Sequence, residues 1–183
     1  MKNIVALICI ATVTLCSATA IADDEAGDTT PAAACISGDP NISDSSHWAT
    51  TAVVLFSENQ YADAVATVDA CFAQWGPKGG HQQKALHDEG AKCPRTGKVS
   101  KRTKTKIDAN GLFNDVALAL WAKARSLHEL GDLEAAKKAY GQCIYMTCGR
   151  AWDPNGWFWS PAEDCAKQVQ ELLDSSDQGK EPA

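Results

Sequence analysis

An internal repeat constrains the fold of this sequence more than any other feature: two segments match when one is shifted by 72 residues. The aligned pairs are Trp48/Leu120, Ala52/Ala124, Leu55/Leu127, Asn59/Gly131, Tyr61/Leu133, Ala64/Ala136, Val68/Tyr140, Cys71/Cys143 and Phe72/Ile144. Apolar periodicity alone aligns large apolar residues, but it does not also align two alanines, a turn residue and a cysteine. The sequence therefore predicts an all-α protein built on a repeated helical hairpin.

The apolar spacing predicts two helices in each repeat unit. They are 47–57 and 61–75 in the first unit, and 115–130 and 132–146 in the second. Ser45 or Ser46 is expected to cap the first helix. Gly76-Pro77 is expected to end the second, because proline lacks the N–H that a helix interior needs.

A fifth helix is predicted after residue 160. Ser160-Pro161-Ala162-Glu163 is a capping box with proline at the first helical position, and the helix should continue to about Asp174. Its apolar face consists of Cys165, Val169, Leu172 and Leu173. Two hairpins expose an unburied end, so this helix is expected to cover it.

Both repeat units resemble tetratricopeptide repeats, which are helical hairpins of 34 residues. The better match is LWAKARSLHELGDLEAAKKAYGQCI, and the other is WATTAVVLFSENQYADAVATVDACF. The chain departs from the family at Lys123 and Thr51, where an apolar residue is usual. It also lacks the proline that closes each repeat, and about 38 extra residues separate the two units. The resemblance, which covers about 55 of the 183 residues, implies a scaffold that binds protein or peptide partners in a concave groove.

The two ends of the chain have compositions that differ from the centre. Residues 1–22 have the short positive start, apolar stretch and small-residue end of a signal peptide, which predicts export to the periplasm or the outside. Residues 23–44 read as an acidic flexible arm, and 175–183 as a disordered tail. Residues 45–174 then form one helical domain, with 76–112 as an irregular basic insert and no segment long enough to span a membrane.

The cysteine pattern predicts disulfides. Six cysteines remain after residue 22, namely Cys35, Cys71, Cys93, Cys143, Cys148 and Cys165. An even number in an exported chain favours disulfides over a metal site, and no CxxC pair is present. Repeat symmetry predicts Cys71–Cys93 and Cys143–Cys165, each separated by 22 residues, which leaves Cys35 for Cys148. Cys148–Cys165 is the main alternative.

A cationic stretch interrupts an otherwise acidic chain. The formal net charge is −6, yet residues 92–106, KCPRTGKVSKRTKTK, hold seven cations and no acid. Lys98, Lys101, Arg102, Lys104 and Lys106 are candidate contacts for an anionic envelope component, although a solvated loop or hairpin is the favoured interpretation. Nucleic acid is not expected as a partner, because the stretch lacks aromatic residues for base stacking.

The segment WDPNGWFWSPAEDC, residues 152–165, contains three tryptophans around a turn sequence. Asp153-Pro154-Asn155-Gly156 should place Trp152 and Trp157 on neighbouring strands. Trp152, Trp157 and Trp159 are candidate contacts for a ligand or partner, but packing between the last repeat and the final helix is the favoured role.

The sequence shows no catalytic constellation. His47, His81, His87 and His128 occur without a motif, and the six-residue step from His81 to His87 does not place two ligands on one helix face. Neither a metal nor a cofactor is expected. The favoured function is an exported adaptor for protein–protein interaction; the alternative is an envelope enzyme or glycan-binding protein that uses the tryptophan loop.

Overall fold

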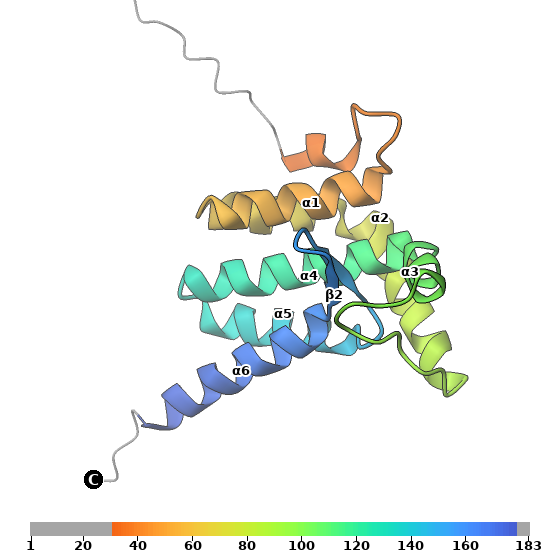
Figure 1. Ribbon diagram of the computed structural model, residues 1–183. Coiled ribbons are helices and arrows are strands. Elements are labelled where there is room, and N and C mark those ends of the chain that lie inside the picture. The colour runs from red at the N-terminus through yellow and green to blue at the C-terminus, as the bar shows by residue number, and fades with distance from the viewer. Residues whose placement is uncertain (1–30, 179–183) are drawn as a thin grey trace, which may run out of the picture.

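The computed structural model describes residues 31–178, which form an all-α protein that is about 70% helical (Figure 1). Its elements are a 3₁₀ helix η1 (Pro31–Cys35), α1 (Asp44–Ser57), α2 (Tyr61–Asp88), α3 (Lys101–Asp108), α4 (Gly111–Glu129), α5 (Leu133–Tyr145), β1 (Ala151–Asp153), β2 (Trp157–Trp159) and α6 (Pro161–Gln178). The predicted signal segment, 1–22, lies outside the described residues, as do 23–30 of the predicted arm and 179–183 of the predicted tail.

Two helical hairpins, α1–α2 and α4–α5, pack against each other through α4. Helix α6 then packs on α5 and α4, while η1 lies on α2 and α1. The predicted class, an all-α fold of two hairpins with a C-terminal helix and disulfides, is confirmed. The Ser160 hydroxyl accepts a hydrogen bond from the Glu163 N–H at 3.2 Å, so the predicted cap forms, and α6 runs four residues past the predicted end at Asp174.

The two hairpins turn in the same way at positions related by the 72-residue shift. Asn59 and Gly131 have positive φ angles of 62° and 76°. The next residue in each case, Gln60 or Asp132, donates its N–H to a carbonyl five residues earlier, at 2.9 and 3.1 Å. This is the Schellman motif, which satisfies carbonyls that the end of a helix leaves without partners. The internal repeat in the sequence therefore corresponds to a repeated local structure.

The core is formed by the small and large residues that the repeat aligns. Trp48, Ala52, Ala64 and Val68 are completely buried in the first hairpin, and Tyr140 is completely buried in the second. Trp48 also donates its indole N–H to the Thr67 carbonyl at 3.0 Å, so the buried polar atom has a partner.

The predicted end of the second helix at Gly76-Pro77 is wrong, because α2 continues to Asp88. Pro77 is exposed, so the carbonyl that loses a bond to it lies near solvent. The glycines here permit close packing instead of ending the helix: a Cβ at Gly79 would lie 2.8 Å from Val116 of α4. Within the predicted irregular insert, 76–112, only residues 89–100 and 109–110 consequently lie outside helices.

Helix α1 begins two or three residues earlier than its predicted cap implies. Ser43 is the N-cap and its hydroxyl accepts a hydrogen bond from the Ser46 N–H at 3.2 Å. Ser45 is buried and donates its hydroxyl to Asp115 Oδ2 at 2.7 Å. The expected capping serine therefore joins α1 to α4 instead.

Three disulfides join the six cysteines of residues 31–178: Cys35–Cys71, Cys93–Cys148 and Cys143–Cys165. The predicted Cys143–Cys165 pair is confirmed, whereas Cys71–Cys93 and Cys35–Cys148 are wrong, as is the alternative Cys148–Cys165. The extension of α2 explains the first error. From Cys71 to Asp88 the helix rises about 25 Å, and the five residues that follow span at most about 17 Å, so Cys93 does not return to Cys71.

Candidate functional site

The tryptophan-rich segment folds into a β-hairpin of two three-residue strands. The Asp153 carbonyl accepts a hydrogen bond from the Gly156 N–H at 2.9 Å, and its side chain accepts one from the Asn155 N–H at 2.8 Å. Gly156 has φ of 101°, a conformation that favours glycine. The prediction that this turn places Trp152 and Trp157 on neighbouring strands is confirmed.

The two faces of the hairpin carry different aromatic side chains. Trp152 lies opposite Phe158, with ring centroids 4.9 Å apart. Trp157 and Trp159 flank Phe158 on β2, so they project from the other face. The hairpin therefore offers Trp152 on one side and Trp157 on the other.

Packing, the favoured role for the three tryptophans, accounts for only one of them. Trp159 is half-buried and meets Trp121 of α4 in an edge-to-face contact, with centroids 5.2 Å apart. Trp152 and Trp157 are 50% and 37% exposed. The buried anchor of the hairpin is Phe158, which is 3% exposed and which the sequence-based prediction did not single out. Phe158 and Trp159 therefore attach the hairpin to the protein, while Trp152 and Trp157 remain accessible.

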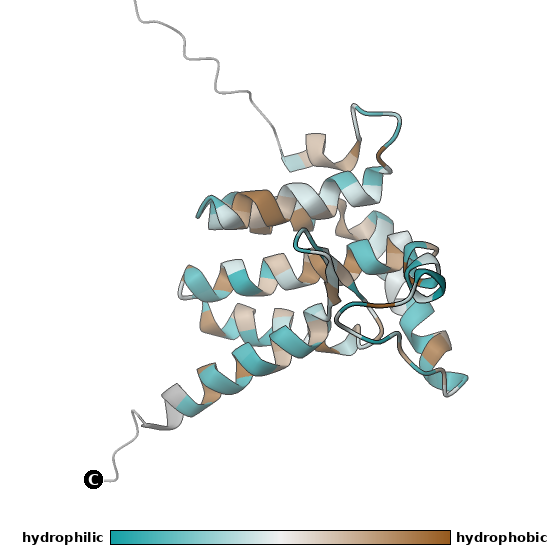
Figure 2. Cartoon of the chain, viewed as in Figure 1, coloured by the Kyte–Doolittle hydropathy of each residue, from teal (hydrophilic) through white to brown (hydrophobic). Residues whose placement is uncertain are grey.

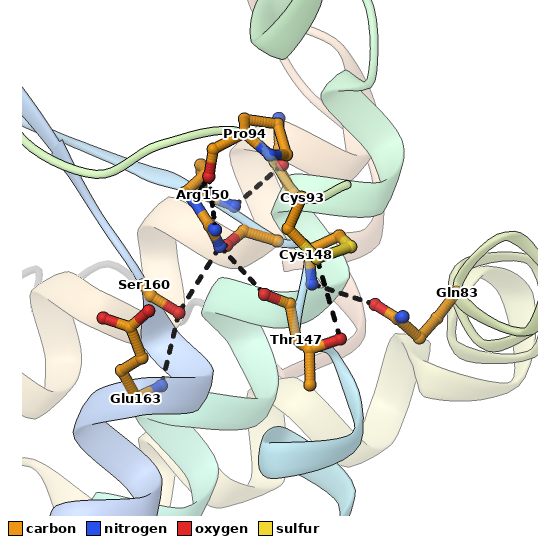
Figure 3. Close-up of a disulfide and its surroundings, with 10 residues drawn as sticks. Gln83, Cys93, Pro94, Thr147, Cys148, Arg150, Ser160 and Glu163 are labelled. Atoms are coloured by element: carbon orange, nitrogen blue, oxygen red, sulfur yellow. Dashed lines mark hydrogen bonds between the residues drawn. A yellow bond between two sulfur atoms is a disulfide. The ribbon is translucent and has the colours of Figure 1, made fainter. Parts of the chain in front are cut away.

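The loop between α2 and α3, residues 89–100, holds the β-hairpin along its second strand, β2. Gly97 and Phe158 exchange two backbone hydrogen bonds, with N···O distances of 2.7 and 3.0 Å. The Cys93–Cys148 disulfide then attaches the same loop to the segment after α5, and the Cys148 N–H donates to Gln83 Oε1 of α2 at 3.0 Å (Figure 3). The hairpin is thus connected to the helical scaffold through the loop.

Arg150 fixes the entrance to the hairpin from within the protein (Figure 3). Its side chain is buried, and its Nε donates to the Pro94 carbonyl at 2.8 Å while Nη1 donates to the Thr147 carbonyl at 2.9 Å. Burial lowers the pKa of the Arg150 guanidinium, and the Glu163 carboxylate opposes that shift. Because these acceptors are neutral carbonyl oxygens, Arg150 has a structural role in joining the loop to the hairpin.

A groove of about 610 Å³ lies beside the exposed Trp157. It is lined by Thr96, Gly97, Trp157, Phe158, Trp159, Ser160, Glu163, Asp164 and Lys167. Asp164 is already engaged, since its Oδ2 accepts bonds from Trp121 Nε1 at 2.6 Å and Arg125 Nη1 at 3.3 Å. Glu163 and Lys167 are exposed. The groove therefore combines aromatic surface with one exposed carboxylate and one exposed ammonium group.

The predicted cationic residues lie next to the tryptophan hairpin. Lys101, Arg102, Lys104 and Lys106 belong to α3, and Lys98 precedes it; all five are exposed. The Lys104 ammonium lies 4.8 Å from the centroid of Trp152 and 5.4 Å from that of Phe158. The structure therefore brings together two features that the sequence separates by about 50 residues, and the expected solvated loop or hairpin is a helix over residues 101–108.

Asp115 is a largely buried carboxyl group that lines a cavity, and the sequence did not indicate it as a candidate site residue. It lines a cavity of about 390 Å³ together with Ser46, Thr50, Ile107, Asp108, Gly111, Asn114, Leu118, Arg150, Ala151, Trp152 and Phe158. Burial raises the pKa of Asp115 to about 6, and the hydrogen bond from Ser45 opposes the shift. The sequence placed Asp115 at the start of a helix, where an exposed carboxylate is common, and gave no sign that α1 covers it.

The histidines do not gather into a site. His81 and His87 are exposed, whereas the Nδ1 atom of His128 lies 3.0 Å from the Tyr140 hydroxyl. His47 lines a separate groove on α1 with Ile42 and Val54. Among residues 31–178, no group of three or more His, Cys, Asp or Glu side chains is arranged to hold a metal ion.

Comparisons with protein-family models, curated proteins and solved structures found no match to this chain. Within the described residues, none of the helices is both long enough and apolar enough to cross a membrane. The resemblance to tetratricopeptide repeats remains a prediction from the sequence.

Proposed function

We propose that this chain is an exported binding module, in which disulfide-braced helices form a scaffold and the tryptophan hairpin contacts a protein or peptide partner. The signal-like segment 1–22 and the three disulfides support export, since disulfides persist in oxidising compartments. The resemblance of both hairpins to tetratricopeptide repeats supports a scaffold for protein contacts.

The observation that carries this proposal is the exposure of Trp157 on a backbone that is held in place. Phe158 is buried, Gly97 pairs with β2, and Arg150 anchors the entrance, so the strand has little freedom. Trp157 nevertheless remains 37% exposed. A large apolar ring presented in a fixed position loses little conformational entropy on binding, and tryptophan is enriched among residues that dominate binding energy.

The groove beside Trp157 suits a peptide side chain with charged neighbours. Trp157 and Trp159 supply apolar surface, while Glu163 and Lys167 supply opposite charges. Protein interfaces commonly place aromatic residues at the centre and polar residues at the rim. A bound segment would therefore place an apolar side chain against Trp157.

Site-specific photocrosslinking in the native envelope tests the proposal. A photoreactive amino acid at Trp157 should crosslink to a discrete protein that mass spectrometry identifies. The matched control is Tyr145 of α5, which is 49% exposed and lines a different pocket, with Phe72 and Leu120. The purified partner should then bind Trp157→Ala at least tenfold more weakly. No crosslinked protein from position 157, or the same proteins from both positions, contradicts the proposal.

A glycan is the second candidate ligand of the same groove. Indole faces stack on sugar rings, and the exposed Glu163 carboxylate is an acceptor for sugar hydroxyls. Binding is favoured over hydrolysis because a glycosidase needs two available carboxyl groups, and Asp164 is engaged by Trp121 and Arg125. Calorimetric titration with soluble envelope glycan fragments distinguishes the two ligands. Heat that is released with the parent protein and is absent with Trp157→Ala favours the glycan over the peptide.

A further inference from the structure

We propose that α3 and Trp152 form a docking surface for an anionic phospholipid bilayer. The proposal does not depend on the groove beside Trp157, because Trp152 projects from the opposite face of the hairpin.

The first support is the concentration of cations on an otherwise acidic protein. Seven Lys and Arg residues lie between positions 92 and 106, whereas the whole chain carries −6. Helix α3 is coloured mostly hydrophilic in Figure 2, and Ile107 is its buried residue. An anionic surface repels most of the protein and attracts this segment, so the charges also set the orientation of docking.

The second support is the position of Trp152. Its ring is 50% exposed and lies 4.8 Å from the Lys104 ammonium, so an amphipathic aromatic group stands beside a cation of α3. Indole rings prefer the interface between lipid headgroups and water. The ring adds an apolar contribution that small inorganic anions do not use.

The chemistry of the cations favours lipid headgroups over a specific protein partner. Five of the seven are lysines, which act as flexible point charges, and arginine is the residue that recognises carboxylate or phosphate in a fixed two-pronged geometry. Asp108 is the acid at the end of α3, and it is paired with Lys104 at 3.1 Å. Lys101, Arg102 and Lys106 are exposed on the same helix.

Vesicle cosedimentation of the oxidised protein tests this surface. The protein should bind vesicles containing phosphatidylglycerol but not vesicles of phosphatidylcholine alone, and added salt should weaken binding. Each cation near such a surface contributes about fivefold in affinity, so the double variant Lys101→Gln/Arg102→Gln should bind roughly 25-fold more weakly. Trp152→Ala should reduce binding by about tenfold, because the ring no longer enters the interface.

The matched control is Lys137→Gln/Lys138→Gln on α5, which removes the same charge from another helix and should bind as the parent protein does. Unchanged melting temperatures show that each variant is folded. The proposal is overturned if the protein binds neither kind of vesicle, or if the control variant weakens binding as much as the α3 variant. It is equally overturned if a soluble sulfated glycan binds as well as the vesicles do and Trp152→Ala has no effect on either.

Discussion

The indole N–H of Trp121 in α4 donates a hydrogen bond to Asp164 Oδ2 in the first turn of α6, at 2.6 Å. Arg125 donates to the same oxygen at 3.3 Å, and the ring of Trp121 contacts those of Phe56 and Trp159 with centroids 5.2 Å apart. One aromatic residue therefore connects α1, the hairpin and α6. The groove beside Trp157 depends on this connection, because Asp164 and Trp159 both line it.

Replacing Asp164 tests how strongly this connection holds α6. Asp164→Ala should lower the free energy of unfolding by about 1–3 kcal/mol, because the half-buried Trp121 and Arg125 donors lose their acceptor. Asp164→Asn keeps an acceptor of the same shape and should lose less. Urea unfolding followed by circular dichroism measures both; equal losses would show that the hydrogen bond to Trp121 contributes little.

The buried Asp115 carboxyl should make stability depend on pH. Its pKa is about 6 in the folded protein and 3.8 is the ordinary value, so the folded state holds its proton more tightly than the unfolded state does. Its contribution to stability is then fully present below pH 4 and is lost as pH rises from about 4 to 6, by roughly 2–3 kcal/mol. Asp115→Asn should remove this pH-dependent contribution to stability.

The measurement is the difference in unfolding free energy between Asp115→Asn and the parent protein at pH 4, 5, 6 and 7. The difference should grow in favour of the variant as pH rises through this window. Taking the difference cancels the titration of all other groups. A difference that stays constant with pH would refute the raised pKa.

Two glycines of α2 form a matched pair for testing how α2 packs on α4. A Cβ at Gly79 would lie 2.8 Å from Val116, so Gly79→Ala should destabilise the protein by about 1–3 kcal/mol. A Cβ at Gly80 meets nothing within 4 Å, so Gly80→Ala should stabilise it by about 0.5–1 kcal/mol through helix propensity. Thermal melts of the two variants should move in opposite directions; a lower melting temperature for both would argue against this packing.

The Cys93–Cys148 disulfide should restrict the motion of the β-hairpin more than the Cys143–Cys165 disulfide does. Replacing either this pair or Cys143–Cys165 by serine removes about 3–4 kcal/mol of stability in the chain-entropy account. Loss of Cys93–Cys148 should also raise amide hydrogen exchange at Phe158, whose N–H donates to the Gly97 carbonyl at 3.0 Å. Loss of Cys143–Cys165 serves as the control, and equal exchange at Phe158 in both variants would contradict this role.

The sequence predicts the parts of this fold that local pattern determines. The hairpin turns at Asn59 and Gly131 and the Ser160 cap depend on residues close together in the chain. Repeat symmetry predicted the Cys143–Cys165 bridge, but the same symmetry failed for Cys71, which pairs with Cys35. The end of α2 was mispredicted because Gly79 has a partner, Val116, that local sequence does not show. Tertiary packing overrides the usual preference of glycine and proline in this segment.

Features of the candidate site that depend on long-range contacts could not be read from the sequence. The pattern identified Trp152, Trp157 and Trp159 but did not distinguish exposed rings from packed ones, because that depends on where Trp121 lies. The contact between Lys104 and Trp152 similarly requires α3 to reach the hairpin. Residue types located the candidate site, while tertiary structure decided the role of each side chain.

The central claim is that the hairpin presents Trp157 and is attached to the protein by Phe158. Melting temperatures of Trp157→Ala and Phe158→Ala test it most directly. Phe158→Ala should lose about 3–5 kcal/mol, because a buried aromatic side chain is removed, and its melting temperature should fall by many degrees. Trp157→Ala should melt within a few degrees of the parent protein. A Trp157→Ala variant that melts as low as Phe158→Ala would show that Trp157 packs the fold, and would contradict the account.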